Sequence, residues 1–348
     1  MPEKLTLPGL IDIHVHLRDP GQTEKEDFTT GTSAALAGGF TTICDMPNNA
    51  EPITTAGKLA EKQAIASEKT VCDIGFHYGS VGDNLDTFAE AAPHAIGLKL
   101  YLNNTTGGYM LDVEHLRKIY ATWPRNKVIL LHTEEDTIDA AIESLEGLDR
   151  PVHVCHMPSR EILEKIIAAK QKGIPVTCGV TPHHLFLTHE DAERLGVYGQ
   201  MKPPLQSAND VAFLWEHLDD IDIIESDHAP HTHEQKQAGA YGVPNLETTL
   251  PLLLKARAEG KITLEQIIDK CHTSPARIFN LPTDDTTSVE VTMEPYVIKN
   301  EQLLTKCGWS PFAGIEVPGR VSKVLLHGSV VYDNGTVIAA PGSGKVLP

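Results

Sequence analysis

The feature that most constrains the fold of this chain is an alternation, repeated eight times, of short apolar runs with longer amphipathic stretches. The apolar runs are rich in β-branched residues and are bounded by turn-forming residues, which is typical of buried β-strands. Strands that alternate with helices in this way form parallel βα units. The predicted strands span residues 9–16, 41–46, 73–78, 97–102, 128–132, 152–156, 176–179 and 221–227.

The stretches between these runs are predicted helices, several of which begin with a Ser, Thr or Asp cap and end at glycine. Eight βα units favour an α/β fold of the (β/α)8 TIM-barrel type, whose chemistry lies at the carboxyl ends of the strands. A doubly wound open sheet is the alternative, but no GxGxxG follows an early strand and no GxxxxGK[ST] occurs. The predicted helices span residues 28–37, 55–68, 112–123, 134–146, 159–172, 208–218 and 246–259.

The C-terminal part of the chain has a different pattern. After a predicted closing helix or two over 263–279, the βα alternation is lost. Residues 321–326 and 330–332 flank a His-Gly-Ser turn, which predicts a β-hairpin. We therefore expect a barrel over 1–284 and a small β-containing extension over 285–348 that packs on it.

Charge and composition exclude several classes of protein. The chain has 29 Lys and Arg against 47 Asp and Glu, a net charge of −18, which opposes binding to nucleic acid or anionic lipid. It contains no run of about 18 apolar residues and no leader-like start, so we expect a cytoplasmic protein without a membrane span. The six cysteines include no CxxC pair and are expected to be reduced core thiols.

Histidines at strand ends are the main functional signal among the 17 in the chain. His14 and His16 are two residues apart in a predicted strand, so their imidazoles point to the same side. Two neutral imidazoles side by side are suitable ligands for zinc. An isolated HxH is equally compatible with two histidines hydrogen-bonded at a barrel rim.

Three further strands end in residues that bind metals. His132 and His156 terminate two apolar strands, and Asp227 terminates another. A carboxylate at such a position can bind a metal and exchange a proton. His153 is three residues before His156 and faces the other way, so we interpret it as a core histidine.

Lys99 is the single charge in the apolar strand 97–102. A buried ammonium must pair, lose its proton or be modified. One interpretation is a salt bridge inside the barrel. The other, favoured by the histidines and the aspartate on neighbouring strands, is reaction with carbon dioxide to a carbamate whose two oxygens bridge two zinc ions.

Seven motifs stand out along the chain: PGLIDIHVHLR at 8–18, DMPN at 45–48, GLKLYLN at 97–103, TPHHL at 181–185, SDHAPH at 226–231, LET at 246–248 and WSPF at 309–312. In these motifs the chain resembles the dihydroorotases of the metal-dependent amidohydrolase superfamily, in particular the dihydroorotase domain of animal multifunctional pyrimidine-synthesis proteins. The resemblance implies two zinc ions per chain, one held by His14, His16 and Asp227 and the other by His132 and His156, with carboxylated Lys99 between them.

The implied reaction is the reversible hydrolysis of (S)-dihydroorotate to N-carbamoyl-L-aspartate, the ring-closing step of pyrimidine biosynthesis in reverse, with Asp227 as general acid and base. Arg18 lies two residues past His16, and its planar fork suits a substrate carboxylate. Asn48 and His231 are expected to bind the same anion. Lys202 replaces the asparagine of bacterial relatives and the arginine of the animal domain. Other predicted substrate contacts are Tyr241, Gly242 and, in a lid after the fourth strand, Thr105 and Thr106.

Two alternatives remain open at this point. A hydantoinase or allantoinase shares the metal centre but acts on substrates without a carboxylate. An inactive dihydroorotase-like subunit would act as a scaffold for aspartate transcarbamoylase. The resemblance also raises a homodimer and an association with aspartate transcarbamoylase for the active enzyme.

Overall fold

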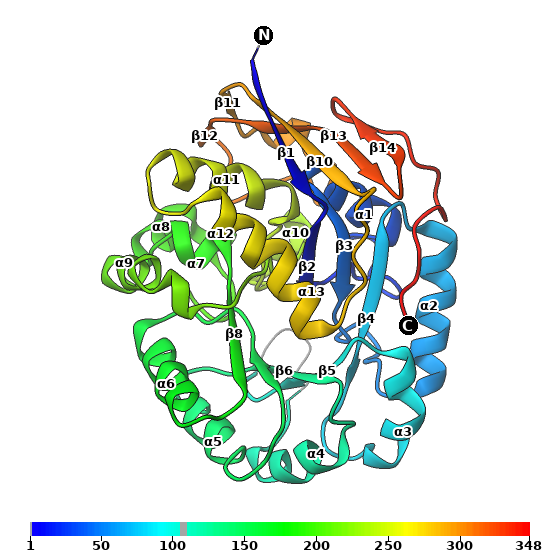
Figure 1. Ribbon diagram of the computed structural model, residues 1–348, viewed down its shortest axis with the longest axis vertical. Helices are drawn as coiled ribbons and strands as arrows, with labels where there is room; N and C mark the ends of the chain where they lie inside the picture. Colours follow the sequence, from blue (N-terminus) through cyan, green and yellow to red (C-terminus); the bar gives the residue numbers. More distant parts are fainter. Residues whose placement is uncertain (1, 105–109) are drawn as a thin grey trace.

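The computed structural model describes residues 2–104 and 110–348, and it contains an eight-stranded parallel sheet curved into a barrel (Figure 1). Each strand pairs with the next along the chain, so the order follows the sequence. The eight predicted strands are thereby confirmed. They are β2 (Leu10–Val15), β3 (Phe40–Asp45), β4 (Asp73–Gly79), β5 (Gly97–Tyr101), β6 (Val128–His132), β7 (Val152–Val154), β8 (Val176–Val180) and β9 (Ile223–Ile224).

The barrel closes between its first strand and the residues that follow its last. Val15 forms a parallel bridge with His228, and the His16 amide donates to the His228 carbonyl at 2.8 Å. The buried carboxylate of Asp12 accepts from the Ser226 amide at 3.1 and 3.3 Å. These contacts bring the carboxyl ends of β2 and β9 together, which places His14, His16 and Asp227 at one point of the rim.

Helices surround the barrel (Figure 1), and side-chain caps mark where several of them begin. Asp27, Thr55, Ser159 and Ser207 each accept from the first turn of their helix. A helix lies within or close to each predicted range: α1 (Phe28–Ala37), α2 (Ala56–Lys69), α4 (Leu116–Thr122), α5 (Ile138–Glu143), α6 (Arg160–Gln171), α9 (Ala208–Glu216) and α11 (Leu246–Ala258).

The structure differs from the predicted helices in three places. The helix expected over 134–146 is shorter, because Asn103 Oδ1 accepts from the Glu134 amide and the Thr137 hydroxyl and holds those residues in a loop. The closing helix contains a π-helical turn, η6 (Asp269–Thr273), between α12 (Leu264–Ile268) and α13 (Ser274–Phe279). Short helices were not predicted: α3 (Phe88–Ala91), α7 (Pro182–Phe186), α8 (His189–Leu195) and α10 (His233–Gln237).

A second sheet, antiparallel, lies against the barrel at the top of Figure 1. It contains the predicted C-terminal hairpin and also the N-terminal strand, which pairs with residues almost 300 positions away in sequence. Because β1 comes from the start of the chain, this sheet is not confined to the predicted extension over 285–348. The predicted domain boundary after residue 284 stays a prediction. Its strands are β1 (Glu3–Pro8), β10 (Ser288–Met293), β13 (Arg320–Leu326), β14 (Ser329–Asp333) and β15 (Thr336–Val337), and β11 (Tyr296–Val297) pairs with β12 (Glu316–Val317) beside it.

The six cysteines are buried and form no disulfide, as predicted for core thiols. The C-terminal residues return to the barrel, where the Leu347 amide donates to the Ile74 carbonyl at 2.7 Å. Within the described ranges, no helix combines the length and apolar character needed to span a bilayer.

Candidate functional site

Most of the predicted side chains line a cleft of about 400 Å³ at the carboxyl ends of the barrel strands, whereas Lys99 and His231 are not part of its lining. This is the position expected for the active site of a TIM-type barrel. Thr105 and Thr106 lie outside the described residues. The cleft is lined by His14, His16, Arg18, Asn48, Tyr101, His132, His156, Lys202, Asp227, Ala229, Tyr241 and Gly242.

His14, His16 and Asp227 form the first group of potential metal ligands. Asp227 Oδ1 lies 3.0 Å from His16 Nε2 and 3.4 Å from His14 Nε2, and all three side chains are buried. One ligand atom from each lies within 4.8 Å of the other two. Three such donors around one point are a usual set for a catalytic zinc ion.

His132 and His156 form the second group. His132 Nδ1 lies 3.0 Å from His156 Nε2, so the two rings direct one nitrogen each toward a common point. The His156 ring is also 5.0 Å from the His14 ring, centre to centre, which makes the two groups adjacent. The other ring nitrogen of His132 is 3.3 Å from Glu134 Oε1.

Lys99 lies on β5, opposite Leu130 of β6, and is fully buried. Its ammonium is 4.8 Å from the centre of the Tyr101 ring and makes no hydrogen bond to any described residue. Over residues 2–104 and 110–348, Lys99 thus lacks the salt bridge considered from the sequence. A buried ammonium without a carboxylate partner is costly, so the environment favours a chemically changed lysine.

The electrostatics of the cleft favour neutral imidazoles. Burial, together with the nearby Lys99 ammonium, holds the pKa of His14 and of His156 well below the ordinary range. Burial also raises the pKa of Asp227 to about 7, with Glu225 adding to the rise and Lys99 opposing it. Neutral imidazole is the form that binds metals. The donor set and the unpartnered ammonium both fit a metal centre.

Arg18 is fixed at the edge of the cleft although it is almost completely buried. Its Nε donates to the Pro230 carbonyl at 3.2 Å, and its Nη2 donates to His231 Nε2 at 3.2 Å. Burial and the neighbouring guanidinium lower the pKa of His231 to about 2, so this imidazole is neutral and can accept. The structure thus brings together two of the three residues predicted to bind an anion.

The remaining predicted contacts form the walls of the cleft. Asn48 Oδ1 lies 2.7 Å from His16 Nδ1, which fixes the orientation of that imidazole. Lys202 donates to the Asn104 carbonyl at 2.6 Å, and its ammonium is 5.0 Å from the Tyr241 ring centre. At Gly242, φ is +127° and a Cβ would lie 2.7 Å from the Ala229 carbonyl, so only glycine fits there.

A buried lysine that the sequence did not indicate holds this wall in place. Lys236 donates to the carbonyls of Gln200, Ala240 and Gly242 at 2.8, 2.8 and 3.0 Å. Its ammonium also lies 5.5 Å from the ring centre of Trp309, in the C-terminal extension. Because Lys236 lies in a short polar helix, its sequence context resembles that of an exposed lysine.

Three site residues adopt backbone conformations that L-residues rarely occupy. The φ angles of Arg18, His156 and Asp227 are +65°, +37° and +45°. Each residue follows the end of a barrel strand, where the turn changes the direction of its side chain. Such backbone strain is concentrated at functional sites in proteins.

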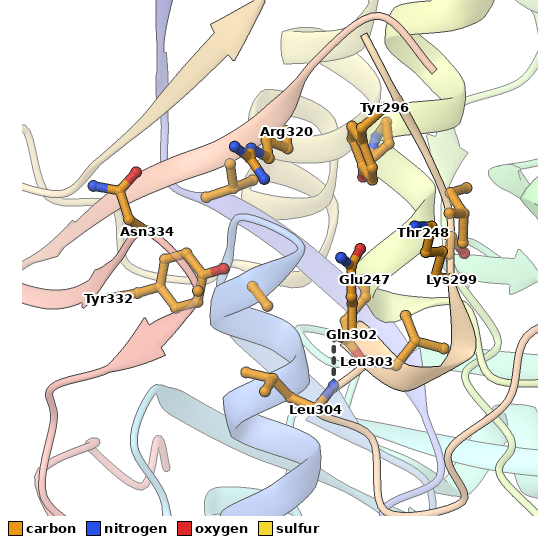
Figure 2. A pocket seen from close by; sticks show the side chains of 15 residues that line it. Glu247, Thr248, Tyr296, Lys299, Gln302, Leu303, Leu304, Arg320, Tyr332 and Asn334 are labelled. Atoms are coloured by element: carbon orange, nitrogen blue, oxygen red, sulfur yellow. Dashed lines mark hydrogen bonds between the residues drawn. The ribbon is translucent and has the colours of Figure 1, made fainter. Parts of the chain in front are cut away.

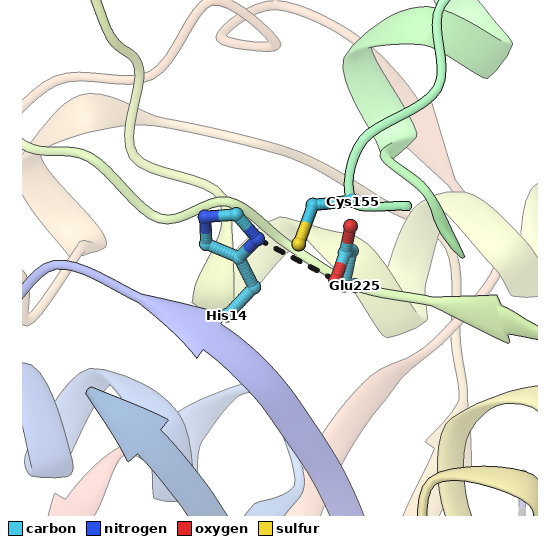
Figure 3. Close-up of side chains that lie close together, drawn as sticks. All are labelled: His14, Cys155 and Glu225. Atoms are coloured by element: carbon cyan, nitrogen blue, oxygen red, sulfur yellow. Dashed lines mark ion pairs between the residues drawn. The ribbon is translucent and has the colours of Figure 1, made fainter. Parts of the chain in front are cut away.

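Glu225 is a second buried residue beside the predicted ligands that the sequence did not indicate. Figure 3 shows its carboxylate beside His14 and Cys155, where Oε2 is 3.5 Å from His14 Nδ1. The same oxygen is 3.6 Å from Nε2 of His153, the histidine predicted to be in the core, which is fully buried. Glu225 follows the apolar pair Ile223 and Ile224, but Asp222 and Asp227 lie in the same predicted strand, so it does not stand out as a lone charge as Lys99 does.

A larger cavity, of about 1090 Å³, lies away from this cleft, where the antiparallel sheet meets α1 and α11 (Figure 2). Its polar lining includes Glu247, Tyr296, Arg320 and Tyr332. Glu247 accepts from the Leu304 and Thr305 amides at 2.8 and 2.9 Å, the first of which is drawn in Figure 2. None of the predicted metal or substrate residues lines this cavity.

Comparisons with known proteins agree with the geometry. The model of the Amidohydrolase family matches residues 5–331. Multifunctional protein CAD of Squalus acanthias is 44% identical over an alignment of 350 positions that covers 98% of this chain and 15% of that protein. Dihydroorotase of Pyrococcus abyssi is 36% identical over 99% of this chain and 87% of its own length.

Solved structures share the fold over nearly the whole chain. L-Hydantoinase from Arthrobacter aurescens superposes with a TM-score of 0.93 at 26% identity, covering 99% of this chain and 88% of that one. The inactive dihydroorotase-like domain of the Chaetomium thermophilum CAD-like multifunctional protein gives a TM-score of 0.85 at 24% identity, covering 99% and 100%. The chain thus spans only a small part of its multifunctional relatives but most of the archaeal dihydroorotases. By sequence and by architecture, the chain belongs to the amidohydrolase family and, within it, to the dihydroorotases.

Proposed function

We propose that this chain is a dihydroorotase that catalyses the reversible hydrolysis of (S)-dihydroorotate to N-carbamoyl-L-aspartate. The observation that carries the proposal is the position of Arg18, a buried cation at the edge of a cleft whose floor is a set of neutral imidazoles and one carboxylate. An anionic cyclic amide needs both features, a cation for its carboxylate and a group that activates water for its ring.

We further infer that the cleft holds two zinc ions. His14, His16 and Asp227 would hold one, His132 and His156 the other, and Lys99, carboxylated on Nζ, would contribute to both. When bound, zinc ions lower the pKa of water and polarise a carbonyl oxygen. Support comes from the buried Lys99 ammonium, which has no hydrogen-bond partner in the described structure and would become an anion on carboxylation.

Asp227 is the residue that moves the proton in this proposal. Its Oδ1 contacts His14 and His16, which leaves Oδ2 as the proton acceptor. Hydrolysis adds hydroxide to the ring carbonyl carbon and a proton to the ring nitrogen as the bond between them breaks. Asp227 takes the proton from water and delivers it to that nitrogen, and ring closure uses the same two transfers in reverse.

Arg18 provides the substrate specificity. Its Nε and one Nη2 hydrogen are committed to Pro230 and His231, so the guanidinium is held in one orientation before substrate arrives. The remaining N–H groups can donate to a carboxylate, with Asn48 and His231 beside them. Lys202, Tyr241 and Gly242 enclose the ring, and Thr105 and Thr106 complete the substrate contacts in the proposal.

The two alternatives make different demands on these residues. Hydantoin and allantoin have no carboxylate, so a buried, oriented Arg18 would have nothing to bind. An inactive scaffold has no need for metal ligands, yet all six proposed ligands are present in this chain, and the described cleft contains or adjoins each of them. Both observations favour dihydroorotase.

The test is a comparison of kcat/KM for dihydroorotate, hydantoin and allantoin with the same zinc-loaded preparation. We expect dihydroorotate to be preferred by at least an order of magnitude, the effect of one charge-assisted bond. N-carbamoyl-L-aspartate should be cyclised at lower pH. A preference for hydantoin or allantoin would contradict the proposal.

We also propose a cytoplasmic homodimer that associates with aspartate transcarbamoylase, as the resemblance to multifunctional pyrimidine-synthesis proteins implies. Size-exclusion chromatography with light scattering, on the purified chain alone and mixed with aspartate transcarbamoylase, tests both associations. A chain with the mass of a monomer that elutes separately from the transcarbamoylase would contradict both.

A further inference from the structure

Glu225 is a fully buried carboxylate that takes no part in the reaction proposed above. It follows β9, two residues before Asp227, and its carboxylate lies beside His14 and Cys155 rather than in the lining of the cleft (Figure 3). A buried charge is strongly unfavourable unless neighbouring groups compensate it. The contacts of its two oxygens indicate what it does.

One carboxylate oxygen fixes the backbone of a proposed metal ligand. Glu225 Oε1 accepts a short hydrogen bond from the His156 amide. His156 has a φ of +37°, a conformation that costs energy for a residue with a Cβ and that persists only where neighbouring contacts hold it. Glu225 thereby stabilises the turn that aims the His156 ring at His132.

The other oxygen faces a ligand of the first group. Glu225 Oε2 lies 3.5 Å from His14 Nδ1, and neither atom makes a hydrogen bond to any described residue. His14 Nε2 points toward Asp227 on the opposite side of the ring. In metal sites, a carboxylate behind a ligating histidine orients the ring, selects its tautomer and raises its basicity.

Gly179 on the neighbouring strand β8 creates the space that Glu225 fills. A Cβ at position 179 would lie 2.7 Å from both Cδ and Oε1 of Glu225, and 3.0 Å from His153 Nε2. Real Cβ atoms do not approach other atoms so closely, so any side chain here would displace the carboxylate. The Glu225 carboxylate and the absence of a side chain at Gly179 are therefore structurally coupled.

We propose that Glu225 is a positioning residue for both halves of the metal centre, holding the His14 ring and the His156 backbone with one carboxylate in the space left by Gly179. The inference rests on the metal centre of the proposed function. It adds that the affinity of this chain for zinc depends on a residue that is not a ligand.

Cys155 offers a competing explanation, since its thiol lies within 4.8 Å of the facing atoms of His14 and Glu225. These three groups could form a metal site of their own. In this structure, however, Glu225 Oε1 already accepts from the His156 amide, and Oε2 faces His14 Nδ1 on the side of the ring opposite Asp227. These contacts are those of a group that positions the two histidines, and none of them involves Cys155.

The experiment measures zinc affinity of metal-free protein by competition with a chromophoric chelator, a readout independent of turnover. Glu225→Ala should lower the affinity for at least one zinc ion by about 10–100-fold, the usual effect of removing a carboxylate that orients a metal ligand. Glu225→Gln keeps an oxygen for the His156 amide and should lose less. Cys155→Ala is the matched control and should bind zinc like the unaltered protein.

Gly179→Ala adds an independent test. In the presence of Glu225, this substitution should lower the affinity for zinc, because the new methyl group displaces the Glu225 carboxylate. Added to Glu225→Ala, it should have no further effect, because that carboxylate is already absent. Unaltered zinc affinity in Glu225→Ala would overturn the proposal, and so would an equal loss in Cys155→Ala. If the unaltered protein binds no zinc, the proposed function fails instead.

Two further measurements distinguish a misfolded variant from a folded variant whose metal ligands are no longer held in position. Circular dichroism of the metal-free variants should match that of the unaltered protein. Cobalt loaded into Glu225→Gln should show a shifted visible spectrum, since the geometry around His14 changes, and an unchanged spectrum would count against the proposal.

Discussion

Arg18 Nη2 lies 3.2 Å from His231 Nε2, so a buried guanidinium donates to an imidazole that burial keeps neutral. Neither residue is near the other in sequence. Their contact crosses the closure between β2 and the residues after β9, the same contact that brings His16 and Asp227 to 3.0 Å. Barrel closure thus builds the metal centre and the anion site together.

Arg18→Met and Arg18→Lys should separate charge from geometry. Lysine keeps the charge and loses the fork, whereas methionine loses both, so methionine should be the more damaging change. A charge-assisted contact is worth roughly 1.5–3 kcal/mol, so kcat/KM for dihydroorotate should fall about ten- to a hundredfold or more. Steady-state kinetics with a zinc determination checks this. Intact dihydroorotate turnover in Arg18→Met would refute the assigned substrate.

Asp227→Asn should separate proton transfer from metal binding. The amide keeps an oxygen but cannot accept a proton, so kcat should fall by about 10²–10⁴-fold. At least one zinc ion should remain, because the histidines are unchanged. Single-turnover kinetics beside metal analysis measures both. Normal turnover with full zinc content would mean that another group is the base.

Lys99→Ala should remove most activity and much of the bound zinc, because it removes the group proposed to connect the two ions. Acetate or propionate supplied in the buffer should restore part of the activity by occupying the place of the carbamate. The matched control is Lys202→Ala, whose ammonium lies at the cleft wall and bonds the Asn104 carbonyl. Carboxylate rescue of Lys99→Ala but not of Lys202→Ala is the expected result.

Glu247 should make the stability of the protein depend on pH. Burial raises its pKa from 4.5 to about 7, despite two amide donors. Between pH 4.5 and 7 the folded protein therefore binds more protons than the unfolded chain. The free energy of unfolding then falls as pH rises, by about 1–3 kcal/mol in total, and levels off above pH 7.

Thermal unfolding of Glu247→Gln across this pH range checks the sign. The variant should lose this part of the pH dependence and gain relative stability toward pH 7. The exposed Glu265 provides a control, since Glu265→Gln should leave the profile unchanged. A profile in Glu247→Gln that is identical to that of the unaltered protein would contradict the assignment.

The strands and the residues at their ends could be predicted because their signals are local. Apolar β-branched runs identify β2 to β9, and a histidine or aspartate at a run's end lies at the barrel rim by the geometry of the fold. Lys99 could be found because one charge in an apolar strand is costly. Asp12, the one acidic residue of the predicted strand 9–16, carries the same signal.

What the sequence could not indicate depends on contacts between distant segments. Pairing of Glu3–Pro8 with β10 is set by tertiary packing, which hydrophobic periodicity does not encode. The positive φ angles of Arg18, His156 and Asp227 arise where the barrel closes around them, since none of these residues prefers that conformation. The role of Gly179 emerges only when Glu225 is placed opposite it.

The most direct test of the account is a zinc titration of the metal-free protein, with dihydroorotate turnover and zinc content measured on the same samples. We expect turnover to saturate at about two zinc ions per chain, because six ligands on five strand ends exceed the four of one tetrahedral site. Full activity at one zinc ion, or activity without zinc, would contradict the two-metal dihydroorotase proposed for this chain.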